Sequence, residues 1–307
     1  MSGFATPRPV TVTQADPVRL LDVDLVIFDF DGTLYEGTGF VEGHLERLQR
    51  YLGQDTPDLA ATYTQVRAGE HVLRLGDLFH LPTATILRPS PEPPSDRFGL
   101  RIDQVLDLDG APAQAPEGVV DGHVAFDAPV TYVGDPWQIA AALGRCFGVG
   151  ETGWREAFAA TRQAMNHPDF DLGVPACLPD LLDRFDHVPQ RVLVTNTAEA
   201  LGGDAVAKVG VADRFHEVVF DAKKPAGLST LIAERSQGLD PTRVLCIGDN
   251  YWNDIVPAYQ LGAQCVLVDP FGAERVSDGP LHLRSLAEVD QILAGHRSRS
   301  VDDRRST

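Results

Sequence analysis

The sequence predicts an α/β protein with a doubly wound, Rossmann-like parallel sheet that carries an inserted, mainly helical domain. An apolar run at residues 24–30 predicts a short buried strand near the start of the chain. From residue 173 onward, predicted strands alternate with helices, a pattern typical of right-handed crossovers in a parallel sheet. The residues between these two parts lack that alternation, so we interpret them as an insertion into one sheet.

The second half of the chain supplies most of the predicted sheet. Apolar runs predict strands at residues 191–195, 217–220, 243–247 and 264–268. Helical patterns precede these strands at residues 175–185, 198–208, 225–235 and 252–261. We expect residues 21–36 and 173–296 to form one α/β core.

The expected insertion covers residues 37–172. Helical spacing predicts helices near residues 41–52, 58–75, 136–147 and 151–166. Asp135 followed by proline is a favourable helix start, with Asp as the N-cap. The proline-rich residues 88–95 predict a loop or a stiff extended linker. Residues 98–133 predict a small β element, because short apolar pieces alternate there with turn signals.

The two ends of the chain and its composition limit the possible partners. Residues 1–20 predict a flexible arm without a signal-peptide stretch, and the charged, serine-rich residues 297–307 predict a disordered tail. No run approaches the roughly 20 apolar residues of a membrane span, so we expect a cytoplasmic protein. The net charge of −18 would repel nucleic acid and anionic lipid, so neither is an expected partner. We expect a monomer or a homodimer.

The four cysteines carry no sign of a metal site or a disulfide framework. They are widely spaced, without a Cys-x-x-Cys pair or a Cys/His cluster. We therefore expect free thiols at Cys146, Cys177, Cys246 and Cys265.

The first candidate site lies where the opening strand ends. Asp29 and Asp31 flank Phe30, and Gly32 follows as a turn signal. Side chains alternate along a strand, so the two aspartates share one face. Ligands of open α/β sheets bind outside the carboxyl ends of the strands, which places both acids at the mouth of an expected site. The alternative is a surface turn with two solvated acids.

Three later segments carry further polar groups. Thr195 and Asn196 follow a buried strand and precede a helix, where they either contact an anion or cap the helix. Lys224 precedes a proline and another helix, as a phosphate contact or as a solvated surface charge. Asp249 and Asp254 follow the strand at residues 243–247. Acids gathered at one sheet edge suit Mg²⁺, which prefers oxygen ligands.

In their order and spacing these segments resemble the four catalytic motifs of the haloacid dehalogenase superfamily. The matching segments are Asp29–Thr33, Thr195-Asn196, Lys224-Pro225 and Asp249–Asp254. The large insertion between the first two motifs resembles the C1-type cap of that superfamily.

The resemblance implies catalytic roles for five residues. Asp29 would be the nucleophile that forms an aspartyl-phosphate. Asp31 would protonate the leaving oxygen and later deprotonate water. Thr195 and Lys224 would hold the phosphoryl oxygens, with Asn196 as a positioning group beside them.

The resemblance also implies a metal site. Mg²⁺ would be bound by the carboxylate of Asp29, the backbone carbonyl of Asp31 and the carboxylate of Asp249. Asp254 would either coordinate the ion directly or hold one of its ligands.

The implied function is a Mg²⁺-dependent phosphatase that hydrolyses a small phosphorylated metabolite. Superfamily members that dehalogenate lack the second aspartate, so Asp31 favours phosphoryl transfer. Two alternatives are a phosphomutase that acts on a sugar phosphate and a non-catalytic binding or regulatory protein with the same fold.

Four other side chains have two interpretations each. Arg67, Arg74 and Arg162 fit solvated helix faces better than contacts with the far end of a substrate. Trp252 either flanks the pocket or faces the core.

Overall fold

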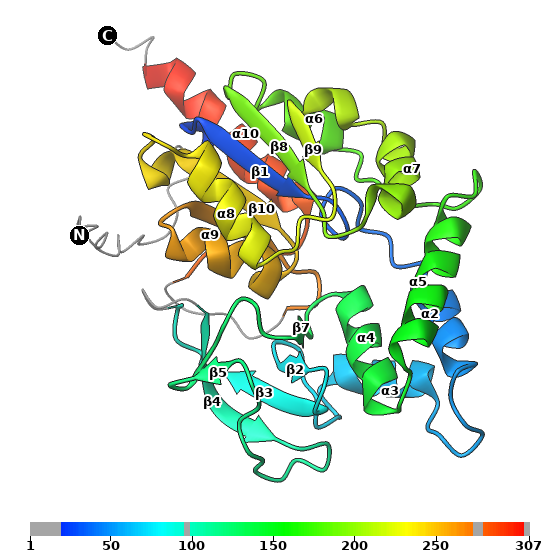
Figure 1. Cartoon of the computed structure of the whole chain (residues 1–307). Helices are drawn as coiled ribbons and strands as arrows, with labels where there is room; N and C mark the ends of the chain where they lie inside the picture. The colour runs from blue at the N-terminus through cyan, green and yellow to red at the C-terminus, as the bar shows by residue number, and fades with distance from the viewer. Residues whose placement is uncertain (1–19, 95–98, 273–278, 304–307) are drawn as a thin grey trace.

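The computed structural model describes residues 20–94, 99–272 and 279–303 (Figure 1). The expected flexible arm of residues 1–20 therefore lies outside the described residues, apart from Leu20. The described chain forms an α/β part with a parallel sheet and a second part with helices and an antiparallel sheet.

The α/β part is built on a six-stranded parallel sheet in the order β12-β11-β10-β1-β8-β9. Its strands are β1 (Leu25–Asp29), β8 (Gln190–Val194), β9 (Glu217–Val219), β10 (Val244–Gly248), β11 (Gln264–Val268) and β12 (Leu281–Leu283). The first strand in the sequence pairs with β10 on one side and with β8 on the other. The opening strand thus lies in the middle of a sheet otherwise formed by the second half of the chain.

Helices cover both faces of this sheet. They are α6 (Leu178–Asp183), α7 (Glu199–Val209), α8 (Ala226–Arg235), α9 (Val256–Gln260) and α10 (Leu286–Asp303). Alternate residues of β1 point to opposite faces of the sheet. Phe28 packs on the face that α6, α7 and α10 cover, and Ile27 packs on the face that α8 and α9 cover (Figure 1). The predicted doubly wound fold class is confirmed.

The C-terminal end corrects one expectation. Helix α10 continues to Asp303, so the tail expected to be disordered from residue 297 is in part helical. No proline interrupts residues 286–303, so nothing in the backbone forces the helix to end earlier. Residues 304–307 lie outside the described part of the chain.

The chain between β1 and β8 holds four helices and a second sheet among its described residues. The helices are α2 (Val41–Gln49), α3 (Leu59–Ala68), α4 (Pro136–Cys146) and α5 (Glu151–Met165). The helix expected at residues 58–75 ends early, because Gly69 adopts a left-handed conformation with φ of 73°. The limits 37–172 for the insertion stay a prediction.

The second sheet is larger than the small β element expected at residues 98–133. It has six antiparallel strands in the order β5-β6-β4-β3-β2-β7. They are β2 (Leu78–His80), β3 (Thr85–Pro89), β4 (Leu100–Leu106), β5 (Val119–Val120), β6 (His123–Val124) and β7 (Val130–Tyr132). Arg88 and Pro89 belong to β3 and not to the expected loop, and Pro89 is accommodated at a register shift against β4.

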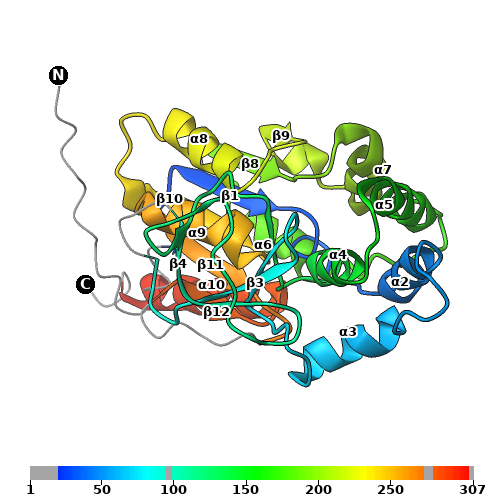
Figure 2. The ribbon, with the colours of Figure 1, turned by 60° about the horizontal axis from the view of Figure 1, so that its bottom comes forward.

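The inserted sheet and its loops pack against the core next to α9 and the residues that precede it (Figure 2). A π-helix, Tyr251–Ile255, precedes α9 where the sequence predicted one continuous helix. Trp252 in this π-helix is buried, and its ring meets the ring of Phe126 edge-on at 5.3 Å. The amide nitrogen Nε2 of Gln260 donates to the carbonyl of Gly99 at 2.8 Å. Trp252 is therefore a core-facing aromatic residue, which was one of the two interpretations of this residue from the sequence.

Two further observations bear on the composition-based expectations. All four cysteines are free thiols, as predicted. Among the described helices, none combines the length and the apolar character that a membrane crossing requires.

A buried histidine joins the helices of the insertion. His44 on α2 shares a hydrogen bond of 3.0 Å with the hydroxyl of Thr161 on α5. Its ring contacts Trp137 and Trp154 at centroid distances of 5.0 and 5.2 Å. Burial, helped by the nearby charge of Arg47, lowers the pKa of His44 to about 4. His44 is therefore neutral in the folded protein at neutral pH.

This neutral histidine should make the fold sensitive to acid. Because folding lowers the pKa of His44, the unfolded chain takes up the proton first, and stability falls as the pH drops from about 6.5 toward 4. Between about pH 7.5 and about pH 5, we expect this group to reduce the free energy of unfolding by about 2 kcal/mol. Urea unfolding of wild type and His44→Gln at both pH values measures the effect. An equal pH dependence in the two proteins would contradict it.

Candidate active site

The predicted site residues meet at the carboxyl edge of the parallel sheet. Asp29 is the last residue of β1, Thr195 directly follows β8, and Asp249 directly follows β10. Parallel strands bring their carboxyl ends to the same edge, so three segments far apart in the sequence converge there. Lys224, in the loop between β9 and α8, reaches the same place.

Lys224 holds two of the acids together. Its buried ammonium nitrogen Nζ lies 2.6 Å from Oδ1 of Asp29 and 2.6 Å from Oδ1 of Asp254. Burial alone would lower the pKa of Lys224, but the charges of Asp254 and Asp29 outweigh burial and raise it above its ordinary value. This arrangement excludes the interpretation of Lys224 as a solvated surface charge.

Asn196 positions the backbone of Lys224. Its oxygen Oδ1 accepts from the backbone N–H of Lys224 at 2.7 Å, and its nitrogen Nδ2 donates to the carbonyl of Lys224 at 3.3 Å. The N-cap of α7 is Ala198, without a side-chain cap, so neither Thr195 nor Asn196 caps that helix. The side-chain hydrogen bonds of Asn196 join two loops of the site.

Three carboxylates form a compact cluster. Oxygens of Asp29, Asp249 and Asp254 all lie within 4.8 Å of one another. Two glycines permit this approach: a Cβ on Gly32 would lie 2.0 Å from Oδ2 of Asp249, and one on Gly248 would lie 2.5 Å from the Cβ of Asp254. Any larger side chain at either position would displace a carboxylate of the cluster.

The charge of this cluster is not balanced by the protein. With all three acids ionised, three carboxylates would face one ammonium, an excess of two negative charges. Burial is the main cause that raises the pKa of Asp29 to about 7, and burial together with neighbouring carboxylates raises the pKa of Asp249. A donor set of carboxylate oxygens with this excess charge fits a hard divalent cation such as Mg²⁺.

Asp31 faces a different set of partners. Its Oδ1 lies 2.5 Å from Nη1 of Arg162 and 2.5 Å from the hydroxyl of Tyr35. Its Oδ2 accepts from the hydroxyls of Thr195 at 2.9 Å and Thr197 at 3.0 Å. Burial would raise the pKa of Asp31, but the charge of Arg162 and the hydrogen bonds outweigh it, so the pKa is lowered. Asp31 is therefore held as a carboxylate, and Thr195 contacts this carboxylate directly.

Arg162 is a site residue that the sequence reasoning assigned to a solvated surface. It is almost fully buried on α5 and also donates from Nη1 to the hydroxyl of Tyr35 at 3.1 Å. Its position in the sequence carried a signal, because it follows Trp154 and Phe158 at steps of four residues. An arginine in an apolar helical stripe needs a buried acid, and here that acid is Asp31.

Asp135 is a second residue whose place in the site was missed. Its Oδ1 caps α4 by accepting from the backbone N–H of Gln138 at 2.9 Å, as the sequence predicted. Its Oδ2 accepts from Nδ2 of Asn250 at 2.7 Å, next to Asp249. Burial, the largest cause, raises the pKa of Asp135 to about 6. Asp135 brings one more carboxylate from the insertion to the cluster.

The space beside the carboxylates is small. A cavity of about 30 Å³ lies between the core and the insertion, with Gly32, Tyr35, Trp137, Asp249 and Phe271 among its lining residues. This volume is close to that of one water molecule in the liquid. The cavity therefore leaves room for little more than a water-sized group beside the carboxylates.

Removal of Arg162 should destabilise the fold, because Asp31 would keep its burial without its ion pair. We expect Arg162→Met to lower the free energy of unfolding by about 3 kcal/mol. Arg155→Met is the matched control on the same helix, since Arg155 is exposed and we expect a change within about 0.5 kcal/mol. Urea unfolding near neutral pH measures both. Equal stabilities of the two variants would contradict the structural role of the Arg162–Asp31 pair.

Several solved structures are similar to this chain at low sequence identity. A search of curated proteins found no match. Similar solved structures include a haloacid dehalogenase (HAD) hydrolase of Bacillus subtilis bound to magnesium. It has 16% identity and a TM-score of 0.49, and the match covers 89% of this chain and 99% of that chain. A predicted phosphoglycolate phosphatase of Haemophilus somnus has 16% identity and a TM-score of 0.49. The match covers 88% of this chain and 98% of that chain.

An L-2-haloacid dehalogenase is similar at 15% identity, with a TM-score of 0.45 and coverage of 89% and 99%. The model of the haloacid dehalogenase-like hydrolase family matches residues 23–262, a span that holds the carboxylates of the site together with Lys224 and Arg162. The chain therefore belongs to the haloacid dehalogenase-like hydrolase family.

Proposed function

We propose that the chain is a Mg²⁺-dependent phosphatase that hydrolyses a small phosphorylated metabolite through an aspartyl-phosphate at Asp29. The observation that supports this most is the cluster of Asp29, Asp249 and Asp254 around the ammonium of Lys224. A phosphoryl group is anionic, so an anionic nucleophile can approach it only where cations offset the charge. The site offers one ammonium and a set of carboxylates suited to a divalent cation.

Each residue of the cluster has a distinct task in this proposal. Asp29 attacks phosphorus, so that one difficult displacement becomes two easier ones. Lys224 binds a phosphoryl oxygen, and its charge lowers the pKa of Asp29 against the larger opposing effect of burial. Asp249 and Asp254, with Asp29, would hold Mg²⁺, which when bound withdraws charge from the phosphoryl oxygens.

Asp31 supplies the proton transfers. Its contacts with Arg162, Tyr35 and the two threonines favour the carboxylate, which is the form that accepts a proton from the attacking water. To protonate a leaving alkoxide, Asp31 must first gain a proton, and the contact with Arg162 opposes this. Because Arg162 lies on α5 of the insertion, movement of the insertion would release Asp31 and open the small cavity at the same time.

The direct test is phosphate release from a panel of phosphorylated metabolites by wild type and Asp29→Asn. We expect Mg²⁺-dependent release by wild type, no release in EDTA, and a loss of at least about a thousandfold in Asp29→Asn, because nucleophilic attack is removed. A panel of 2-haloacids assayed for halide release serves as the comparison. Halide release without phosphate release, or phosphate release that survives Asp29→Asn, would contradict the proposal.

A further inference from the structure

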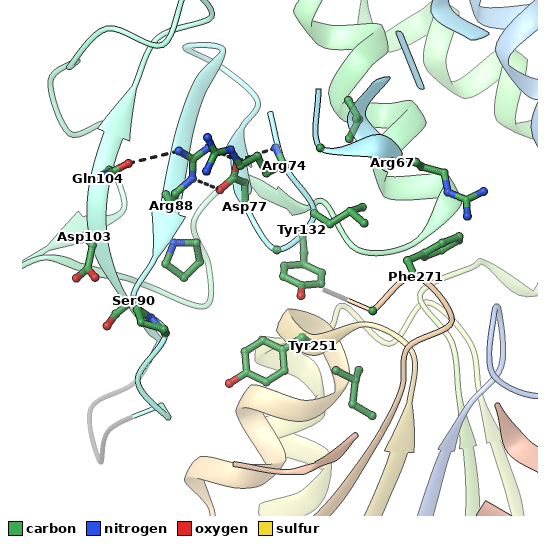
Figure 3. Close-up of a pocket in the computed structure, with 18 of the residues that line it drawn as sticks. Arg67, Arg74, Asp77, Arg88, Ser90, Asp103, Gln104, Tyr132, Tyr251 and Phe271 are labelled. Carbon is green, nitrogen blue, oxygen red and sulfur yellow. Dashed lines mark hydrogen bonds and ion pairs between the residues drawn. The ribbon is translucent and has the colours of Figure 1, made fainter. Parts of the chain in front are cut away.

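A second and larger cavity, of about 520 Å³, lies between the inserted sheet and the α/β core. Cavities of this size accommodate small organic ligands. Its walls come from α3, from β3 and β4 of the inserted sheet, and from the core beside the π-helix (Figure 3). We call it the sheet pocket, and its principal residues are Arg67, Arg74, Arg88, Tyr132, Tyr251 and Phe271.

The two acids that line the sheet pocket are already paired. Asp77 is buried, and its carboxylate receives Nε and Nη2 of Arg88, each at 2.9 Å. Asp103 forms an ion pair with Arg101 at 3.1 Å. The negative charges of the lining are therefore offset by these two arginines.

Two other arginines of the lining keep their positive charge available. Within residues 20–94, 99–272 and 279–303, neither Arg67 nor Arg74 has a carboxylate partner, and both side chains are exposed. Figure 3 shows Arg74 beside Arg88, and the guanidinium of Arg67 lies 4.4 Å from the ring centre of Phe271. In a chain with a net charge of −18, this is a local positive region.

The floor of the sheet pocket is aromatic. Tyr132 and Tyr251 are buried, and their ring centres are 6.1 Å apart with an interplanar angle of 43°. The hydroxyl of Tyr251 is buried and has no hydrogen-bond partner among the described residues. Aromatic rings thus line the same pocket as the arginines.

We propose that the sheet pocket binds a small organic anion with a planar, apolar body. Its carboxylate or phosphate would pair with Arg74, since guanidinium groups bind both anions in the same way. Its body would lie on Tyr132 and Tyr251. Phe271 lines both this pocket and the small cavity at the catalytic carboxylates. The anion is therefore either the non-reacting end of the substrate or a separate effector.

Calorimetric titration with 2-naphthoate tests the site without any catalysis. We expect 2-naphthoate to bind wild type about tenfold more tightly than the neutral 2-naphthalenemethanol, and acetate, which lacks the ring, to bind far more weakly. Arg74→Gln should weaken 2-naphthoate about tenfold and leave the neutral alcohol unchanged.

Arg155→Gln is the matched control, since it removes an exposed arginine of α5, a helix that contributes no residue to the lining of the sheet pocket. It should bind 2-naphthoate as wild type does, and Asp249→Asn should do the same if the site is separate from the catalytic carboxylates. Equal affinities for 2-naphthoate and the alcohol would overturn the proposal. Equal losses in Arg74→Gln and Arg155→Gln would also overturn it.

Inhibition of phosphate release distinguishes the two sources of the anion. Competitive inhibition by 2-naphthoate would identify the pocket as the place of the substrate's non-reacting end. Non-competitive inhibition or activation would identify a separate effector site. Both results support an anion site, and the binding measurements stand even where the proposed phosphatase activity fails.

Discussion

The repulsion among carboxylates at one edge of a parallel sheet is the constraint on which the rest of this structure depends. Asp29, Asp249 and Asp254 lie closer together than three acids would remain in water, and the ammonium of Lys224 holds two of them. Each neighbouring feature serves this arrangement. Gly32 leaves room for the carboxylate of Asp249, and Asn196 fixes the backbone that carries Lys224.

A second charge balance ties the insertion to the core. Asp31 belongs to the core, whereas its counterion Arg162 is on α5 of the insertion, and the pair is largely shielded from water. Asp135, at the start of α4, brings a further carboxylate to Asn250. The ionisation of the site is therefore set by both parts of the molecule. In the arrangement described here, the cavity between them holds little more than one water molecule.

The sequence predicted the site best where functional residues lie at the ends of apolar strands. Most strands of the parallel sheet contain an apolar run, and Asp29, Thr195 and Asp249 lie at or directly after the end of such a strand, so their convergence at one edge could be predicted. Arg162 could not be placed in this way, because a charged residue on a helix usually faces solvent. Asp135 was recognised only as a helix cap, since its second oxygen contacts Asn250, which is distant in sequence.

The inserted sheet was underestimated for a related reason. Several of its strands have only two or three residues, too few for an alternating pattern to be recognised. Pro89 lies within a strand at a register shift, where the sequence favours a loop. Tertiary pairing, and not local propensity, determines this part of the fold. The sheet pocket could not be predicted from the sequence either, because Arg74 and Tyr251, which line it, come from distant parts of the chain.

The account rests on an excess of negative charge that a divalent cation balances, and calorimetric titration with Mg²⁺ tests this most directly. The account predicts that one Mg²⁺ binds wild type and that Asp249→Asn loses most of this affinity, because one of the three clustered carboxylates becomes neutral. Asp103→Asn, which changes an exposed acid outside the cluster, should bind Mg²⁺ as wild type does. Absence of Mg²⁺ binding to wild type, or unchanged binding in Asp249→Asn, would contradict it.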